Sequence, residues 1–221
     1  MLHISEIFIS IQGEGPLIGR PAVFLRLAGC NLDCIWCDTK YARKPRFVWS
    51  IDKVTSVISK LLTNTNLIVI TGGEPLLQAN ELRKLLARIR EIKPGVIVQL
   101  ETNATLSIDP VKDLIDVVVA SPKLSNSGNP PDKRKIHDSF IDIARASRPL
   151  LYLKFVIDKE DDIYEVNDIV NKLKVCKERV YLMPQCTTLE EQLEKLKLVT
   201  RLALRYGYCV SPRLQILLNI R

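Results

Sequence analysis

"AGCNLDCIWCDTK", residues 28 to 40, carries Cys30, Cys34 and Cys37 in a C-x3-C-x2-C pattern with no fourth cysteine nearby. Cysteine thiolates bind zinc ions or iron–sulfur clusters. Structural zinc sites are closed by four ligands, and a [4Fe–4S] cluster normally takes four cysteines. Three thiolates therefore leave one coordination position open, as in metal centres that take part in chemistry.

Two other interpretations of these cysteines remain open. The histidines of the chain, His3 and His137, form no pair with zinc-ligand spacing, so zinc would need a distant fourth ligand such as Cys186. In the second interpretation, the cysteines are three buried thiols that lie close together by chance. That would suit an apolar segment, whereas this loop contains the charged residues Asp33 and Asp38. The residues favour an iron–sulfur cluster with one open iron.

The composition indicates a globular protein of ordinary kind. The chain has 221 residues, of which 47% are hydrophobic and 26% are charged, which is ample for a buried core. We read no signal peptide at the N-terminus, and no apolar run reaches membrane-spanning length. We therefore expect a cytoplasmic protein with no membrane partner and reduced cysteines. Cys176, Cys186 and Cys209 are expected to be small buried residues.

The net charge of +7 can indicate a nucleic acid partner or an anionic substrate. The densest basic stretches are "KYARKPR" (40–46) and "DKRK" (132–135). Neither has the aromatic interleaving of a platform that binds single-stranded nucleic acid. We favour an ordinary lysine-rich surface and expect no direct nucleic acid partner.

Short β-branched runs alternate with amphipathic helical patterns, which predicts an α/β fold with parallel strands. Strands are expected at 6–11, 22–27, 67–70, 96–100, 116–119, 150–157, 180–183 and 208–211. Helices are expected after Ser50 and around 82–89, 163–173 and 189–199, where apolar residues recur at helical spacing.

The segments that follow the predicted strands are small, polar or rich in glycine. They read "AGCNLDC", "TGGEP", "ETN", "SPK", "PQC" and "SPR". The carboxyl ends of parallel strands share one rim, where ligands bind. We therefore expect these loops to converge on one site. The polar, proline-rich segment 121–135 is expected to be the most mobile.

Two of these loops resemble the radical S-adenosylmethionine (SAM) superfamily. The pattern C-x3-C-x-aromatic-C, with Trp36 as the aromatic residue, is its signature, and "TGGEP" (71–75) is similar to its second motif. The resemblance implies a [4Fe–4S] cluster held by Cys30, Cys34 and Cys37, with SAM chelating the open iron. It also implies one domain over residues 1–221, folded as a partial TIM-like (β/α) barrel with a trimmed core.

A longer segment, "EIFISIQGEGPLIGRPAVFLRLAGCNLDCIWCDTKY" (6–41), closely resembles the start of the 7-carboxy-7-deazaguanine synthase family. This implies a lyase that converts 6-carboxy-5,6,7,8-tetrahydropterin to 7-carboxy-7-deazaguanine with release of ammonia, in queuosine or archaeosine biosynthesis for tRNA. It implies SAM and Mg2+ as cofactors, an external one-electron reductant and a homodimer. The N-terminal substrate loop would lie within residues 1–20 and the cluster loop within 28–41.

The resemblance also implies roles for individual residues. Substrate contacts are expected from Ile11, Gln12, Gly13, Glu14, Arg26 and Thr71. Contacts to SAM are expected from Trp36, Cys37, Asp38, Gly73, Ser121, Pro122, Lys123, Met183, Pro184, Gln185 and Cys186, and from Glu101 to the ribose hydroxyls. Thr39 matches the Mg2+ ligand, and Mg2+ prefers oxygen donors and few protein ligands.

Some of these roles have alternatives. Arg26 lies inside an apolar strand, where its charge is costly unless an anion such as a substrate carboxylate pairs with it. It could instead be a surface arginine on an edge strand, and Glu101 could be a rim carboxylate that touches no ribose. Gln215 stands where the family often has histidine, so a substrate contact from the C-terminal segment is left open.

Other functions share part of this pattern. A glycyl-radical activase would have both cluster motifs but would lack "IQGEGP" together with Arg26. A metal-containing nucleic-acid-binding module would need closed metal ligation and a continuous basic face. An electron-transfer ferredoxin should have four clustered cysteines and a much shorter chain.

Overall fold

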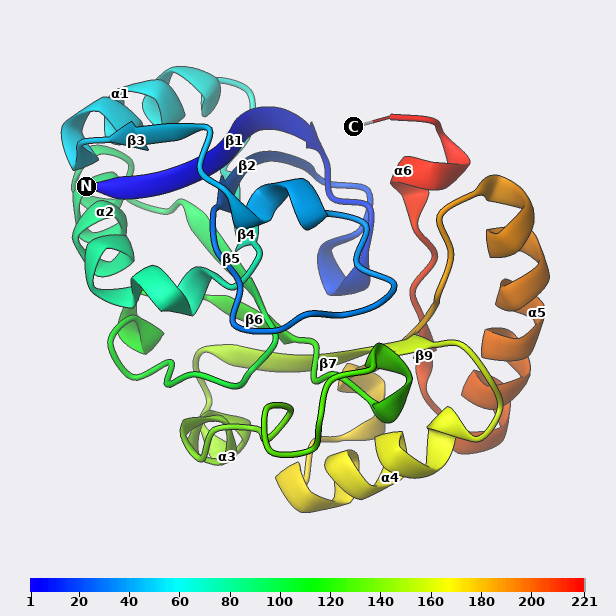
Figure 1. Ribbon diagram of the computed structural model, residues 1–221. Coiled ribbons are helices and arrows are strands. Elements are labelled where there is room, and N and C mark those ends of the chain that lie inside the picture. Colours follow the sequence, from blue (N-terminus) through cyan, green and yellow to red (C-terminus); the bar gives the residue numbers. More distant parts are fainter. Residues whose placement is uncertain (221) are drawn as a thin grey trace.

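The structure is a computed structural model and describes residues 1–220. Its strands form one curved sheet in the order β3-β1-β2-β4-β5-β6-β7-β8-β9 (Figure 1). The strands are β1 (Leu2–Ile11), β2 (Pro21–Leu27), β3 (Phe47–Trp49), β4 (Leu67–Gly72), β5 (Ile97–Thr102), β6 (Val117–Ala120), β7 (Leu150–Ile157), β8 (Val180–Pro184) and β9 (Cys209–Val210). Every strand expected from the sequence is present, and the short β3 is additional.

Strand direction makes this sheet a partial barrel. Each neighbouring pair from β2 to β9 is parallel, whereas β1 is antiparallel to both β2 and β3. The order runs from β3 to β9 without pairing these two edges, so the barrel of the described residues is open along one side. This is the trimmed (β/α) barrel that the sequence predicts.

The helices α1 to α5 lie on the outside of the curved sheet (Figure 1). The helices of the chain are α1 (Ile51–Leu61), α2 (Ala79–Ile92), α3 (Ser139–Arg145), α4 (Asp162–Leu173), α5 (Leu189–Tyr206) and α6 (Leu214–Leu217). Ser50 caps α1, because its side chain accepts a hydrogen bond from the backbone N–H of Lys53. The helices expected from apolar spacing are α1, α2, α4 and α5, and α3 and the short α6 are additional.

The main core lies between the sheet and these helices. In β4 the run "LIVI" (67–70) is fully buried, as expected for a parallel strand that is covered on both faces. In α2 only one stripe is buried, formed by Leu82, Leu85, Leu86 and Ile89. The continuous apolar run of β4 and the helical spacing of apolar residues in α2 therefore mark the two surfaces that pack together.

The C-terminal segment lies beside the open side of the barrel. Figure 1 shows α6 between β1 and α5, with the segment that joins β2 to β3 crossing the mouth in front of the strands. The N–H of Leu214 donates a hydrogen bond to the carbonyl of Gly13 at 3.0 Å. The last residues of the described chain thus contact the loop that follows β1.

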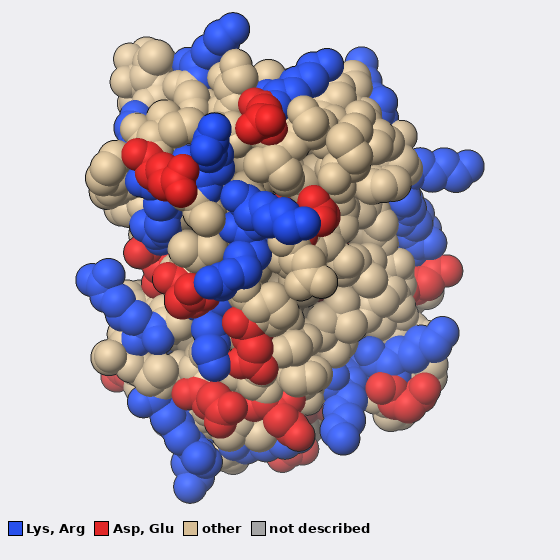
Figure 2. Space-filling view, turned by 90° about the vertical axis from the view of Figure 1, so that its left-hand side faces the viewer, with Lys and Arg blue, Asp and Glu red and all other residues tan. Residues whose placement is uncertain are grey.

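The surface that carries α1 and α2 has mixed charge. Figure 2 shows Lys and Arg side chains interspersed there with Asp and Glu. This side is therefore not the continuous basic face that a nucleic-acid-binding module needs. None of the helices within residues 1–220 combines the length and apolar character needed to cross a membrane.

Leu85→Ala should lower the free energy of unfolding by about 2–5 kcal/mol, because it removes a fully buried side chain from α2 and leaves a cavity. Leu204→Ala is the matched control, since Leu204 also lies in a helix but is 81% exposed. That change should cost less than about 0.5 kcal/mol. Denaturant unfolding measures both, and equal losses would contradict the packing of α2 described here.

Candidate active site

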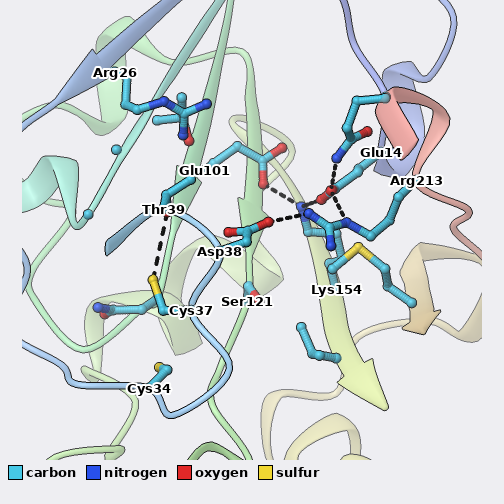
Figure 3. Close-up of a pocket in the computed structure, with 18 of the residues that line it drawn as sticks. Glu14, Arg26, Cys34, Cys37, Asp38, Thr39, Glu101, Ser121, Lys154 and Arg213 are labelled. Atoms are coloured by element: carbon cyan, nitrogen blue, oxygen red, sulfur yellow. Dashed lines mark hydrogen bonds and ion pairs between the residues drawn. The ribbon is translucent and has the colours of Figure 1, made fainter. Parts of the chain in front are cut away.

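One cavity of about 290 Å3 lies at the carboxyl ends of the parallel strands. Figure 3 shows side chains from several strands and loops pointing into a common space. All the loops that were expected to converge contribute to its lining. The predicted site residues that line it are Ile11, Gln12, Gly13, Glu14, Arg26, Cys30, Cys34, Trp36, Cys37, Asp38, Thr39, Thr71, Gly73, Glu101, Ser121, Lys123, Met183, Pro184, Gln185 and Cys186. Pro122 is buried and is not among the lining residues.

The cysteines of the cluster loop line this cavity, and the sulfur atoms of two of them accept hydrogen bonds. The Sγ atom of Cys34 accepts a hydrogen bond from Asn129 Nδ2 at 3.2 Å, and that of Cys30 accepts one from the N–H of Leu32 at 3.5 Å. Burial raises the pKa of both the Cys30 and Cys34 thiols. Because a metal binds the thiolate, loading the site releases protons here.

This donor set fits a [4Fe–4S] cluster. Among residues 1–220, no three His, Cys, Asp or Glu side chains surround one point closely enough to hold a single metal ion. In a [4Fe–4S] cluster each thiolate binds its own iron, so the sulfurs need not converge on one atom. Hydrogen bonds to the sulfurs, such as the one from Asn129 to Cys34, tune clusters of this kind.

The segment "TGGEP" packs directly on the cluster loop. A Cβ atom on Gly73 would lie 2.1 Å from the carbonyl oxygen of Gly29 and 2.8 Å from Cys30 Cβ, so a larger residue does not fit. The N–H of Glu74 donates to the same Gly29 carbonyl at 2.8 Å. The buried Glu74 carboxylate accepts from Thr102 Oγ1 at 2.8 Å. These contacts join the ends of β4 and β5 to the cluster loop.

Arg26 is an internal residue of the sheet. It lies in β2, between β1 and β4, so the alternative of an edge-strand arginine is wrong. Its Nε donates to Glu6 Oε2 at 2.9 Å, and the two side chains are only 16% and 12% exposed. Tyr41 donates to the same Glu6 oxygen at 3.1 Å. The terminal nitrogens of Arg26 have no hydrogen-bond partner among residues 1–220, which leaves them for a ligand.

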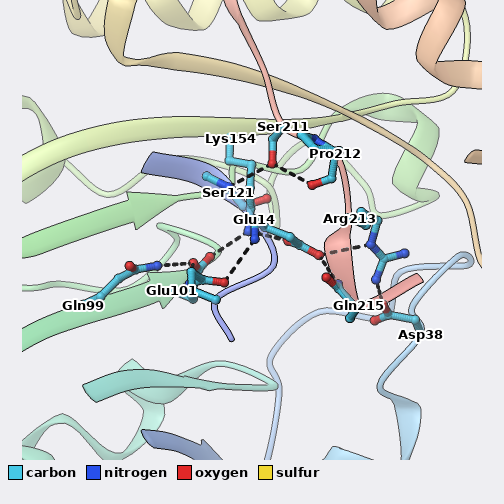
Figure 4. Close-up of polar contacts among 12 residues, drawn as sticks. Glu14, Asp38, Gln99, Glu101, Ser121, Lys154, Ser211, Pro212, Arg213 and Gln215 are labelled. Atoms are coloured by element: carbon cyan, nitrogen blue, oxygen red, sulfur yellow. Dashed lines mark hydrogen bonds and ion pairs between the residues drawn. The ribbon is translucent and has the colours of Figure 1, made fainter. Parts of the chain in front are cut away.

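Lys154, in the middle of β7, is the centre of a buried charge cluster (Figure 4). Its Nζ lies 2.8 Å from Glu14 Oε2 and 2.8 Å from Glu101 Oε2. Glu101 Oε1 also accepts from Gln12 Nε2 at 3.3 Å and from Gln99 Nε2 at 2.6 Å. A lysine charge inside an apolar strand is tolerated because it is paired in this way.

Arg213 connects this charge cluster to two further loops. Its Nε donates to Glu14 Oε1 at 3.0 Å, and its other nitrogens donate to Asp38 and to the carbonyl of Cys186 (Figure 4). Gln215 Nε2 also donates to Glu14 Oε1, at 2.6 Å. Gln215 Oε1 is buried without a partner among the described residues. The C-terminal segment therefore contacts the N-terminal loop, the cluster loop and the loop after β8.

These contacts hold three side chains in their charged forms. Burial alone would raise the pKa of Glu14, but Lys154 and Arg213 hold it well below its ordinary value. Burial would lower the pKa of Lys154, yet Glu101 and Glu14 raise it above its ordinary value. Burial would also lower the pKa of Arg213, while Glu14 and Asp38 raise it. Glu14, Lys154 and Arg213 are therefore ionised at neutral pH.

The expected SAM residues from β6 and from the cluster loop lie near one another. Lys123 Nζ donates to Ser121 Oγ at 2.8 Å and lies 5.8 Å from the centre of the Trp36 ring. Burial lowers the pKa of Lys123. Thr39 Oγ1 is 3.7 Å from Cys37 Sγ, so the expected Mg2+ ligand stands next to an expected cluster ligand.

Comparison with known proteins places the chain in a family. It matches the radical SAM superfamily over residues 25–146. It is 38% identical to the 7-carboxy-7-deazaguanine synthase of Hyperthermus butylicus, over 100% of this chain and 94% of that protein. It is 36% identical to the enzyme of that name from Pyrobaculum aerophilum, over 98% of this chain and 94% of that protein. The chain belongs to the 7-carboxy-7-deazaguanine synthase family.

Solved structures share the fold of this 7-carboxy-7-deazaguanine synthase family member. QueE from Escherichia coli has a TM-score of 0.71 at 24% identity, over 96% of this chain and 93% of that chain. Streptococcus suis SuiB, solved with S-adenosylmethionine bound, has a TM-score of 0.62 at 17% identity, over 83% of this chain and 48% of that chain. The predicted radical SAM barrel is confirmed, and the superfamily match supports a [4Fe–4S] cluster and SAM as cofactors.

One expectation about this family member needs correction. Cys186 is buried as expected, but Cys176 is exposed and Cys209 is half-buried. The reason is their position: Cys176 lies just before a surface 3-10 turn, and Cys209 lies in the edge strand β9. Within residues 1–20, where the substrate loop is expected, β1 occupies Leu2–Ile11 and the loop residues follow it from Gln12.

The sequence analysis missed Lys154 and Arg213. Lys154 interrupts the apolar strand "LLYLKFVI" (150–157), which is the same signal that drew attention to Arg26. Arg213 belongs to "SPR", one of the loops expected at the rim. Their pairing with Glu14 had no local signal, because Glu14 lies 140 residues from Lys154 in the chain.

Glu14→Gln should destabilise the protein at pH 7, and its cost should shrink as the pH falls. The folded-state pKa of Glu14 is lowered, so its contribution to stability is complete above the ordinary value of 4.5 and is lost below it. The difference in unfolding free energy between wild type and variant should shrink by about 2 kcal/mol between pH 5 and pH 3. Denaturant unfolding measures this difference.

The matched control for this pH series is Glu194→Gln, which changes an exposed carboxylate on α5. The difference between this variant and wild type should be the same at both pH values. A pH-independent difference for Glu14→Gln would contradict the ion pairs of the charge cluster.

Proposed function

We propose that the protein converts 6-carboxy-5,6,7,8-tetrahydropterin to 7-carboxy-7-deazaguanine with release of ammonia, as a radical SAM lyase of deazapurine biosynthesis. The observation that carries this proposal is the near-full-length similarity to 7-carboxy-7-deazaguanine synthases. The cavity adds support, because the three cysteines and the expected substrate residues line it together. The product would enter the pathway to queuosine or archaeosine in tRNA.

Cys30, Cys34 and Cys37 would hold the cluster in the wall of the cavity, with one iron left for SAM. With SAM bound, this group would supply the radical chemistry that begins with removal of a hydrogen atom from C6 of the substrate. Gly73 would contact SAM through its backbone, and its lack of a side chain lets the end of β4 pack against Gly29 and Cys30 of the cluster loop. The other SAM contacts are proposed for Trp36, Asp38, Ser121, Pro122, Lys123, Met183, Pro184, Gln185 and Cys186, with Glu101 near the ribose.

The substrate carboxylate would pair with Arg26. The charge of Arg26 is already balanced in part by Glu6, but the terminal guanidinium nitrogens of Arg26 have no hydrogen-bond partner among residues 1–220. A guanidinium with two adjacent N–H donors matches the geometry of a carboxylate. Thr71 pairs with Arg26 in the register of β2 and β4, so it would lie beside the same end of the substrate.

The charge cluster would form hydrogen bonds with the edge of the pterin ring. Glu14 offers carboxylate oxygens, and Gln12 offers an amide. Gln215 Oε1 is buried without a partner in the described chain, so it can accept a hydrogen bond from an N–H of the ring. This supports a C-terminal substrate contact despite the departure from the family's histidine. Ile11 and Gly13 would line the flat face of the ring.

Some parts of this proposal rest on the resemblance to the family. Thr39 would provide an oxygen ligand for Mg2+, which would also contact the substrate carboxylate and water. The enzyme would be a cytoplasmic homodimer that takes electrons from an external one-electron reductant. The family match does not favour a glycyl-radical activase or a nucleic-acid-binding module.

A product assay tests the proposed reaction. The protein is reconstituted anaerobically with iron and sulfide, and SAM, dithionite, Mg2+ and 6-carboxytetrahydropterin are added. Mass spectrometry should detect 7-carboxy-7-deazaguanine together with 5'-deoxyadenosine. Release of 5'-deoxyadenosine alone would retain the radical SAM chemistry and contradict the substrate. Absence of both, from protein shown to contain its cluster, would contradict the whole proposal.

Arg26→Ala should raise the KM for the pterin about 10- to 100-fold, because a charge-assisted hydrogen bond contributes about 1.5–3 kcal/mol. Formation of 5'-deoxyadenosine in the absence of substrate should continue, since Arg26 holds no cluster ligand. Arg88→Ala, which changes an exposed arginine of α2, is the matched control and should leave the KM unchanged. Loss of 5'-deoxyadenosine formation in Arg26→Ala would show that the pair with Glu6 has a structural role instead.

A further inference from the structure

Lys154 is a buried cation to which the proposed reaction assigns no role. Its side chain is only 7% exposed, and it lines the cavity from the middle of β7. A lysine that is buried in a strand loses both its hydration and its rotamer freedom, so its position there needs a compensating interaction. The geometry around its Nζ atom supplies that interaction and also indicates a role in the reaction.

The ammonium group of Lys154 joins two carboxylates. Its Nζ lies 2.8 Å from Glu14 Oε2 and 2.8 Å from Glu101 Oε2, and Figure 4 shows it between the two. An ammonium group has three N–H donors, so each carboxylate receives one of them. Glu14 belongs to the loop after β1, whereas Glu101 lies in β5. Lys154 therefore fixes the separation of two carboxylates that come from distant segments of the chain.

The second oxygen of each carboxylate is held by other side chains. These donors are Arg213 and Gln215 for Glu14, and Gln12 and Gln99 for Glu101. Each of these four donates to one carboxylate and not to the other. Among residues 1–220, the ammonium of Lys154 alone pairs with both carboxylates.

The ammonium also keeps these two like charges together. Without it, Glu14 and Glu101 would face each other across the cavity wall with no cation between them, and their repulsion would drive them apart. Arg213 would still neutralise Glu14. Glu101 would have no cation left, because Lys154 is its ion-pair partner within the described chain. Loss of the ammonium would thus displace Glu101 relative to Glu14.

The two carboxylates face two different ligands in the proposed function. Glu14 contacts the pterin, and Glu101 lies near the ribose of SAM. Removal of a hydrogen atom needs the reacting atoms about 3–3.5 Å apart, and an error of about 1 Å can slow a reaction about 100-fold. The separation that Lys154 fixes is therefore the one on which the transfer depends.

We propose that Lys154 is a positioning residue that sets the separation between the pterin and SAM, so that hydrogen removal from the pterin outpaces unproductive cleavage of SAM. This inference rests on the proposed function and deepens it. In the step concerned, the C6–H bond of the pterin breaks and a C–H bond forms at the 5' carbon that SAM supplies. One hydrogen atom moves with its electron. Lys154 exchanges no proton with either ligand and acts through Glu14 and Glu101.

Lys154→Gln tests this role, because glutamine is shorter and uncharged and cannot hold both carboxylates. The cluster-loaded protein is given SAM, dithionite, Mg2+ and 6-carboxytetrahydropterin. Mass spectrometry then measures the 5'-deoxyadenosine released per molecule of 7-carboxy-7-deazaguanine. This ratio should rise at least tenfold, and kcat for the product should fall about 100-fold. The KM for the pterin should change less than kcat, since Arg213 and Gln215 still hold Glu14.

Pterin that carries deuterium at C6 gives a second readout. The 5'-deoxyadenosine released by the wild type should contain this deuterium. Most of that released by Lys154→Gln should not, because SAM is then cleaved while the C6 hydrogen of the pterin is out of reach. A purely structural role for Lys154 would lower the yield of both products and leave the deuterium fraction unchanged.

Two controls separate the bridge from other effects. Lys197→Gln makes the same change on the exposed face of α5 and should leave the ratio unchanged. Gln99→Met removes one hydrogen bond to Glu101 from the same buried network but keeps the bridge, so it should change the ratio far less than Lys154→Gln.

A second variant covers the case in which Lys154→Gln does not fold, since it leaves a buried carboxylate unpaired. Lys154→Arg keeps the positive charge but replaces the ammonium with a larger, planar guanidinium, which changes the separation of the two carboxylates. The ratio should rise in this variant too. Its iron content, and the change in its electron paramagnetic resonance signal when SAM is added, should match the wild type.

The outcomes separate the positioning role from the proposed function. A raised ratio with a lowered deuterium fraction, in either variant of Lys154, supports the inference. A wild-type ratio in a folded, cluster-loaded variant would overturn it, and so would a loss of both products at an unchanged deuterium fraction. Absence of 7-carboxy-7-deazaguanine from the wild type itself would instead contradict the proposed function.

Discussion

The organisation of the site depends on one buried ammonium group. Lys154 Nζ lies inside the curved sheet between the carboxylates of Glu14 and Glu101. An unpaired charge there would cost several kcal/mol, and so would two carboxylates without their lysine. In the folded protein, the loop after β1 and the end of β5 therefore have to lie against β7. This requirement draws the N-terminal loop over the mouth of the barrel.

An open barrel needs a substitute for the strands it lacks, and the C-terminal segment provides one. Arg213 contacts Glu14, Asp38 and the carbonyl of Cys186, so one side chain joins three loops. The site is thus closed by polar contacts of side chains rather than by further strand pairing. Such contacts can be exchanged for contacts to a ligand, whereas the hydrogen bonds of a sheet cannot be exchanged without unfolding it.

Local patterns in the sequence predicted most of the fold and the metal-binding loop. The β-branched runs marked the strands, and the spacing of Cys30, Cys34 and Cys37 marked the cluster loop, because both signals are confined to a few residues. Strand ends were less accurate: β4 continues to Gly72 because its partner Leu27 in β2 continues that far. The pairing of Lys154 with Glu14 and the position of Arg213 depend on the assembled barrel, so no short stretch of sequence contains them.

Electron paramagnetic resonance of the reduced, reconstituted protein, with and without SAM, tests the central claim most directly. Three thiolates that leave one iron open should give the signal of a reduced [4Fe–4S] cluster, and addition of SAM should change that signal. The iron content should approach about four per chain. A protein that binds zinc and gives no signal, or a cluster signal that SAM leaves unchanged, would contradict the account.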